Sequence, residues 1–261
     1  MRLADIALRG EMGIPGVLSA PQWGFYDVLF SHTNKDLALK PEDKRAFSLT
    51  QKYASYVMEN VLFKISFPAE FHAQTACEAA VILHPQVRNR LHEIERIVIT
   101  THESAIRIIS KVGTLANAAD RDHCIQYMTA VPLIFGNLVA EQYEDDFHAA
   151  HPIIDRLREK MEIVEEPRYT REYLEADKRS IANAVQVFFN DGSSTEQVVV
   201  EYPIGHRRRR AEGIPLLEEK FKANLATRFT GQRSAEIFAL CKDQAALEAT
   251  AVQRFVDLFV I

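Results

Sequence analysis

The chain has 261 residues, of which 47% are hydrophobic and 26% charged, so it is long enough for one large domain or two modest ones. Its formal net charge of −5 gives no indication of nucleic-acid binding, and no apolar run approaches the roughly 18 residues of a membrane span. The three cysteines, Cys77, Cys124 and Cys241, are too widely spaced to indicate a zinc site or a disulfide framework. They fit a reducing environment, so we expect a cytoplasmic protein that does not bind membranes.

Residues 1–60 predict helices. The apolar residues near the start, Leu3, Ile6 and Ala7, follow helical spacing, but no capping Ser, Thr, Asp or Asn precedes them. A helix that opens at the first residue without a start signal indicates a chain that lacks a natural N-terminal part. A later helix start is predicted at Pro41, because acidic residues follow a proline there.

Residues 61–204 show the mixed pattern of an α/β unit. The stretch FKISFPAEFH begins with alternating apolar and polar residues, which predicts a strand over 61–67 that Pro68 ends. Residues 94–102 predict a second strand because they are rich in β-branched side chains. Strands are also predicted on both sides of the turn residues Asn190 to Ser193, a hairpin signal. Helices are predicted at 72–83, at 120–138 with a kink at Pro132, and at 144–161.

Residues 205–261 return to helical patterns. Pro215 is predicted to open one helix, and two more are predicted at 232–241 and 244–260. The simplest arrangement places the two helical ends, 1–60 and 205–261, in one body, with residues 61–204 inserted between them. The sequence therefore predicts an α+β fold.

Most motifs of known chemistry are missing. The early glycines do not follow a strand as a dinucleotide-binding loop would, and there is neither a P-loop nor a GxSxG motif. The histidines are scattered without acidic partners at ligand spacing, so we expect no metal. The basic run Arg207 to Arg210 has two interpretations. It is either a polyanion-binding patch or a loop packed against acidic helices or an interface, and the acidic protein favours the latter.

Two groups of residues could carry catalysis. Lys64 lies among aromatic residues in the stretch quoted above, where it is either a solvated strand residue or a cation for a ligand. His123 and Tyr127 have the spacing of neighbours on one helix face, which suits a base and an acid. The alternative for this pair is a half-buried helix with polar tips.

Three segments together resemble one known family, MmgE/PrpD. They are FKISFPAEFHAQTA, RDHCIQYMTAVPLIFG, and YPIGHRRRR followed by GIPLLEEKF. The resemblance extends over essentially the whole chain, which corresponds to about the C-terminal half of such an enzyme. It is strongest to the branch of the family that dehydrates 2-methylcitrate.

The resemblance implies an all-helical domain, here N-terminally truncated, with a smaller inserted α/β lid domain. It implies a hydro-lyase of propionate catabolism that acts on a small tricarboxylate, with citrate and isocitrate as further substrates to consider, without a cofactor, and as a homodimer in full-length form. The alternative is a truncated, inactive fragment that serves at most as an interaction or structural piece.

The resemblance also assigns site residues. Lys64, Tyr127 and His123 correspond to catalytic positions, with Lys64 on a substrate carboxylate and the other two near the acid/base step. The substrate-binding positions that it implies are His72, Gln126 and Gly24.

Overall fold

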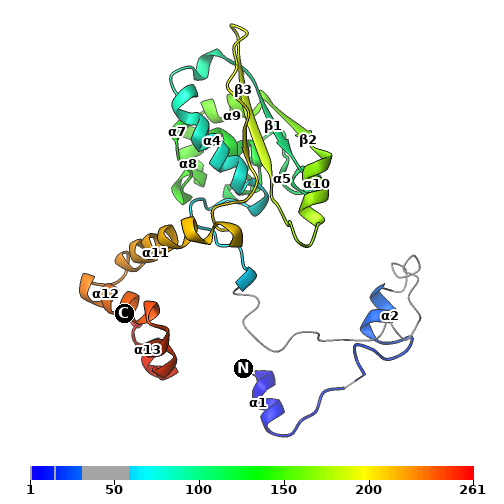
Figure 1. Cartoon of the computed structure of the whole chain (residues 1–261), viewed down its shortest axis with the longest axis vertical. Helices are drawn as coiled ribbons and strands as arrows, with labels where there is room; N and C mark the ends of the chain where they lie inside the picture. Colours follow the sequence, from blue (N-terminus) through cyan, green and yellow to red (C-terminus); the bar gives the residue numbers. More distant parts are fainter. Residues whose placement is uncertain (1, 15, 31–58) are drawn as a thin grey trace. The chain divides into compact units, whose positions relative to one another are not determined.

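The computed structural model describes residues 2–14, 16–30 and 59–261, and the chain divides into two compact units, Met1–Tyr56 and Val57–Ile261 (Figure 1). The described helices of the first unit are α1 (Arg2–Leu8) and α2 (Phe25–Phe30), and α1 buries none of its residues. The helix start predicted at Pro41 lies outside the described residues.

The second unit is built on a four-stranded mixed sheet with the strand order β2-β1-β3-β4. β1 pairs with β2 in parallel and with β3 antiparallel, and β4 pairs antiparallel with β3. The sheet together with its helices confirms an α+β fold. The strands are β1 (Ile94–Thr101), β2 (Met161–Glu165), β3 (Asn183–Phe189) and β4 (Val198–Val200).

The core lies between the sheet and a pair of helices, α4 (Gln74–Val87) and α7 (Ile125–Phe135), which pack against each other on one side of the sheet (Figure 1). α4 is rich in alanine, and these small side chains let it approach α7 and β3 closely. From the sheet, Ile97 and Ile99 of β1 point into this core with no exposed surface. β1 and the hairpin were predicted correctly, because β-branched runs and turn residues are local signals.

A cysteine thiol replaces a missing backbone hydrogen bond in α7. Pro132 lies inside this helix, and because proline has no N–H, the carbonyl of Met128 loses its helical partner. The buried Sγ of Cys77 on α4 donates to that carbonyl at 3.2 Å. The proline therefore does not end the helix, and one polar contact joins the two core helices.

Some predicted elements are wrong. Residues 61–67 form no strand, although Ile65 and Phe67 are buried and alternate with exposed Lys64 and Ser66. None of the described strands pairs with this segment. Instead the Phe63 N–H donates to Gly205 O at 3.1 Å, and the Arg210 guanidinium donates to Val61 O at 2.8 Å.

Two predicted helices are each divided. The segment 120–138 contains α6 (Ala118–Asp122) and α7, because Cys124 between them has an extended backbone. The segment 144–161 breaks at His151, which precedes a proline and is therefore disfavoured in a helix. It contains α8 (Asp145–Ala150), α9 (Ile153–Arg158) and the start of β2, an edge strand that the prediction missed.

Helices follow the sheet to the end of the chain. Pro215 lies inside α11 and does not open it, because the helical turn η6 (Arg207–Arg209) leads directly into that helix. The predicted helix 244–260 is interrupted at Thr250. The observed helices are α11 (Arg210–Ala226), α12 (Gly231–Lys242), α13 (Gln244–Ala249) and α14 (Val252–Asp257). Among the described residues, none of the helices combines the length and hydrophobicity of a membrane span.

Candidate functional site

Four polar side chains meet at the carboxyl end of β1. His102 follows that strand directly and caps α5 (Glu103–Ile109). Glu70 and His72 come from the turn before α4, and Tyr173 comes from α10 (Pro167–Leu174), which follows the parallel strand β2. Carboxyl ends of strands are where open α/β sheets bind ligands.

His72 is hydrogen-bonded at both ring nitrogens. Its Nδ1 lies 2.8 and 2.9 Å from the two carboxylate oxygens of Glu70, and its Nε2 lies 3.2 Å from Tyr173 Oη. Burial tends to raise the pKa of Glu70, but the hydrogen bond and charge of His72 outweigh it and lower that pKa. An ionised carboxylate only accepts hydrogen bonds, so Nδ1 carries a proton, and whenever the ring is uncharged its Nε2 accepts from the tyrosine.

The uncharged ring of His102 packs against this group from the buried side. Its ring stacks on Tyr173 with a centroid separation of 4.7 Å and lies 5.2 Å from the ring of His72. Complete burial, assisted by the charge of His72, lowers the pKa of His102 to about 4, so the ring is neutral at pH 7. Its Nδ1 accepts from the Ala105 N–H, and its Nε2 has no partner among the described residues.

The backbone of His72 is held independently of its ring. Asn183, at the start of β3, donates to the His72 carbonyl at 2.7 Å and lies equally close to Thr75 Oγ1. The backbone N–H of His72 donates to Glu70 at 2.8 Å. The ring is therefore presented from a fixed turn.

Lys64 contacts Phe71, the residue that precedes His72. The side chain of Lys64 is exposed, and its Nζ lies 5.5 Å from the ring centroid of Phe71. The carbonyl of Lys64 accepts a hydrogen bond from Lys220 on α11. The exposed ammonium group can therefore meet an anion from solvent.

Tyr127, Gln126 and His123 lie in other surroundings. Tyr127 has no exposed surface, donates to Gln142 O at 2.5 Å, and has its pKa raised by burial to about 12. Gln126 is buried and binds the Lys111 N–H at 3.2 Å. No contact in the described part of the chain joins either residue to Lys64.

His123 does not share a helix face with Tyr127, which corrects that expectation. It ends α6, whereas Tyr127 lies on α7, and it is partly exposed beside Asp122. Gly24 belongs to the first unit, where its N–H donates to Ala20 O at 2.8 Å. A Cβ there would lie 2.6 Å from Ala20 backbone atoms, so the turn requires glycine.

The four consecutive arginines are used within the chain. Arg207 donates to Asn60 at 3.0 Å, and Arg208 donates to the Asp177 carbonyl and lies over Tyr202. Arg209 forms ion pairs with Glu78 and Glu212, both at 2.9 Å. With the bond of Arg210 described above, these contacts favour the packing interpretation of this run over the polyanion patch.

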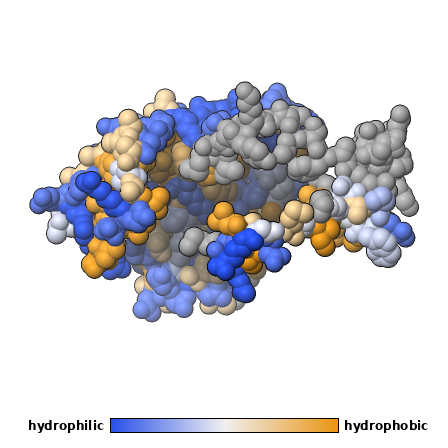
Figure 2. Space-filling view, turned by 90° about the horizontal axis from the view of Figure 1, so that it is seen from below, coloured by the Kyte–Doolittle hydropathy of each residue, from blue (hydrophilic) through white to orange (hydrophobic). Residues whose placement is uncertain are grey.

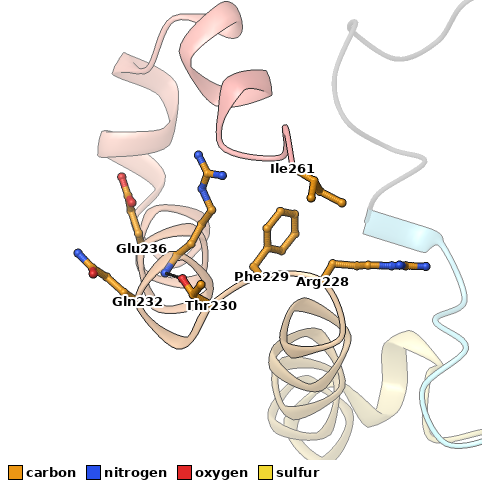
Figure 3. A pocket seen from close by; sticks show the side chains of 7 residues that line it. Arg228, Phe229, Thr230, Gln232, Glu236 and Ile261 are labelled. Atoms are coloured by element: carbon orange, nitrogen blue, oxygen red, sulfur yellow. Dashed lines mark hydrogen bonds between the residues drawn. The ribbon is translucent and has the colours of Figure 1, made fainter.

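Two cavities of the described residues are lined by residues outside the His72 group. One of about 410 Å³ lies between the end of α11, the start of α12 and Ile261 (Figure 3). Near it, Arg233 donates to the Val260 carbonyl at 2.8 Å. Another of about 460 Å³ is lined by Lys111 and Arg158. No group of His, Cys, Asp and Glu that could hold a metal occurs among the described residues.

Three residues of the group, Glu70, His102 and Tyr173, were missed by the sequence analysis. His102 follows a predicted buried strand, and Glu70 stands two residues before His72, so both positions could have been flagged. Tyr173 could not, because only the fold brings α10 to the turn before α4.

The chain resembles curated 2-methylcitrate dehydratases along its length. It is 53% identical to that of Cupriavidus necator and 51% identical to that of Escherichia coli K12, covering 100% of this chain and 52% of each relative. The mitochondrial 2-methylcitrate dehydratase of Yarrowia lipolytica is 48% identical over 100% of this chain and 48% of its own length. The chain thus spans about half the length of the curated relatives that it matches.

The profile of the MmgE/PrpD C-terminal domain matches residues 67–244, a range that contains the sheet, Glu70, His72, His102 and Tyr173. The resemblance read from the sequence is confirmed, and the chain belongs to the MmgE/PrpD family.

Proposed function

We propose that this chain serves a 2-methylcitrate dehydratase, a hydro-lyase that converts 2-methylcitrate to 2-methyl-cis-aconitate and water. The observation that carries the proposal is the 53% identity with the Cupriavidus necator enzyme over the entire chain. Because the chain spans about half of that relative, the complete active site is expected to use residues from the other half as well.

The chemistry of the substrate fits the surroundings of His72. A tricarboxylate must exchange its hydration for cations and N–H donors, or desolvation would prevent binding. Lys64 provides an exposed ammonium near Phe71, and we assign it to a substrate carboxylate. We assign His72 to substrate binding, as the family resemblance implies. The family resemblance supports the remaining assignments, which are Tyr127 and His123 near the acid/base step and Gln126 and Gly24 at the substrate.

We further propose that residues 61–204 form a lid over a helical body to which residues 1–60 and 205–261 contribute. The bond between the Phe63 N–H and Gly205 O supports this, because the chain enters and leaves the α/β unit at one place. Closure of the lid would exclude water from the reaction. The proposed enzyme is a cytoplasmic homodimer that needs neither cofactor nor metal.

The test is an assay of this chain with 2-methylcitrate in metal-free buffer, following the ultraviolet absorbance of the new conjugated double bond. The chain is assayed alone and mixed with the remaining half of the Cupriavidus necator enzyme as a separate polypeptide. We expect turnover at least in the mixture. Absence of turnover in both would contradict the proposal and leave the alternative, a structural or interaction piece.

Lys64→Ala tests the carboxylate contact. Loss of a charge-assisted hydrogen bond is expected to raise KM by about tenfold or more, since such bonds contribute roughly 1.5–3 kcal/mol. Lys222→Ala is the matched control, because Lys222 also places its ammonium over a phenylalanine ring, at 4.3 Å from the centroid of Phe238. Equal effects of the two substitutions would exclude a specific role for Lys64.

A further inference from the structure

We propose that Glu70, His72 and Tyr173 form a proton relay in which Tyr173 Oη contacts the substrate and Glu70 is a positioning residue for the imidazole. The inference rests on the proposed function, because it names the group that moves the proton in that dehydration. It rests on geometry in which a carboxylate, an imidazole and a phenol are joined in sequence by hydrogen bonds of 2.8 and 3.2 Å.

The order of the three groups fixes the direction of transfer. Glu70 holds the proton on Nδ1, so the lone pair on Nε2 faces the phenolic hydroxyl. A base oriented by a carboxylate and bonded to a hydroxyl is the arrangement that activates hydroxyl groups in many enzymes. Here the 3.2 Å bond to the phenol is the longer of the two, and a substrate atom can shorten it on binding.

The relay is accessible on one side and supported on the other. Glu70 and His72 keep 15% and 13% of their side-chain surface exposed, and Tyr173 is also only partly buried. Beneath them lies His102, which is fully buried and stacked on the tyrosine. A proton relay requires such partial exposure, because the substrate must reach the tyrosine.

The relay can balance the dehydration by itself. The phenolic proton moves to Nε2 while the phenol oxygen takes the carbon-bound proton, and the C–H electron pair becomes the new π bond. The C–O bond breaks with its electron pair on oxygen, and that oxygen takes a proton back from Tyr173, which recovers its own from Nε2. The products are the alkene and water, and both side chains return to their starting states.

Few titratable groups of the described residues contact the ring of His72. The titratable groups that face His72 are Glu70 from its own turn, His102 from the end of β1, and Tyr173 from α10. During the transfer His72 becomes an imidazolium, which the Glu70 carboxylate stabilises. Because His102 is neutral, it adds no opposing charge at neutral pH.

Kinetics on the active mixture test the relay. Tyr173→Phe keeps the ring stacked on His102 and removes only the hydroxyl, and it should lower kcat about 100-fold with KM changed by less than about threefold. The matched control is Tyr169→Phe, the same substitution at a buried position of the same helix, which should leave kcat within about twofold. Full kcat in Tyr173→Phe would overturn the relay while the proposed function stands.

Glu70→Gln tests whether Glu70 positions the imidazole, while the side chain can still accept from the His72 backbone N–H. Glutamine retains an acceptor for the His72 N–H but loses the charge that stabilises the imidazolium. We expect a kcat at least about tenfold lower and an acidic limb of the kcat/KM profile moved to lower pH. An unchanged pH profile with only a raised KM would overturn the positioning role.

Nitrogen NMR of His72 provides a readout that needs no activity. The Nδ1–H tautomer is expected in the unmodified chain, because Glu70 accepts from Nδ1. An Nε2–H tautomer would overturn the relay. An inactive mixture of unmodified chains would overturn the proposed function and, with it, the catalytic role of the relay. An active mixture in which Tyr173→Phe keeps full kcat would overturn the relay alone, so the two failures are distinguishable.

Discussion

The α/β core and the C-terminal helices differ in how far they bury their apolar side chains. In α4 and α7 most apolar side chains are buried, whereas in α11–α14 only Gly213, Leu225 and Ile237 are buried. The surface view shows hydrophobic residues interspersed among hydrophilic ones (Figure 2). Large apolar side chains that remain exposed in this region include Leu216, Val252, Val256, Phe259 and Val260.

The difference shows which region is stabilised by its own buried apolar surface. The core buries its apolar surface within residues close by in the fold and gains most of its stability there, at roughly 25 cal/mol per Å² buried. The C-terminal helices are held by fewer contacts, such as the ring pairs Phe221–Phe238 at 6.2 Å and Phe255–Phe259 at 5.2 Å. We therefore expect the two regions to respond differently to the same perturbation.

The largest difference is expected for a leucine truncated in each region. Leu83→Ala removes a fully buried side chain of α4 and should lower the free energy of unfolding by about 3 kcal/mol or more, since a cavity remains. Leu216→Ala in α11 changes a side chain that is 42% exposed and should cost less than about 1 kcal/mol. Urea unfolding measures both, and equal losses would break the comparison.

Acid should weaken the core more than helices α12–α14. The folded pKa of His102 lies at about 4, below its ordinary value of 6.5, so the unfolded chain binds the extra proton first. The stability from this residue is complete above pH 6.5 and is lost as the pH falls from 6.5 towards 4, by up to about 3 kcal/mol. α11–α14 contain no histidine.

Hydrogen exchange at several pH values separates the two regions. Protection of β1 should fall between pH 6.5 and 4 while that of α12 stays constant. His102→Gln should flatten the pH dependence of β1. A parallel loss of protection in α12 would contradict the assignment to His102.

The smallest effects are expected from the same glycine substitution in each region. Gly136→Ala at the end of α7 should cost about 2 kcal/mol, because its φ is +76° and a Cβ would lie 2.8 Å from the His84 ring. Gly113 has a φ of +84°, but a Cβ there would meet no atom within 4 Å. Gly113→Ala therefore measures the backbone strain without a steric clash of the Cβ. Gly231→Ala in α12 meets nothing within 4 Å and should raise stability by up to about 0.5 kcal/mol. Thermal unfolding ranks the three.

Local signals in the sequence predicted much of the fold. The run of β-branched residues in β1 and the turn at Asn190 determine their own conformations, and both were predicted correctly. Whether residues 61–67 become a strand depends on a partner far away in sequence. The helix break at Cys124 has no proline or glycine to announce it.

The candidate site divides in the same way. Lys64 and His72 lie in one short stretch with recognisable family features, so the sequence could point to both. The relay needs Tyr173, 101 residues after His72, and the orientation of each ring nitrogen, which only packing determines. Whether Tyr127 and His123 act at the substrate stays a prediction, and the structure adds no contact between them and His72 among the described residues.

The adjacency of Phe63 and Gly205 has a mechanical consequence. A Cβ on residue 205 would lie 1.7 Å from the Phe63 carbonyl oxygen, so the two chain crossings touch and no side chain fits between them. Tension applied at residue 59 and at α11 would pass across this junction and through the bonds of Arg207 and Arg210 to residues 60 and 61. These bonds would have to break before the load reached the sheet. The arginines would therefore protect the core from unfolding under tension.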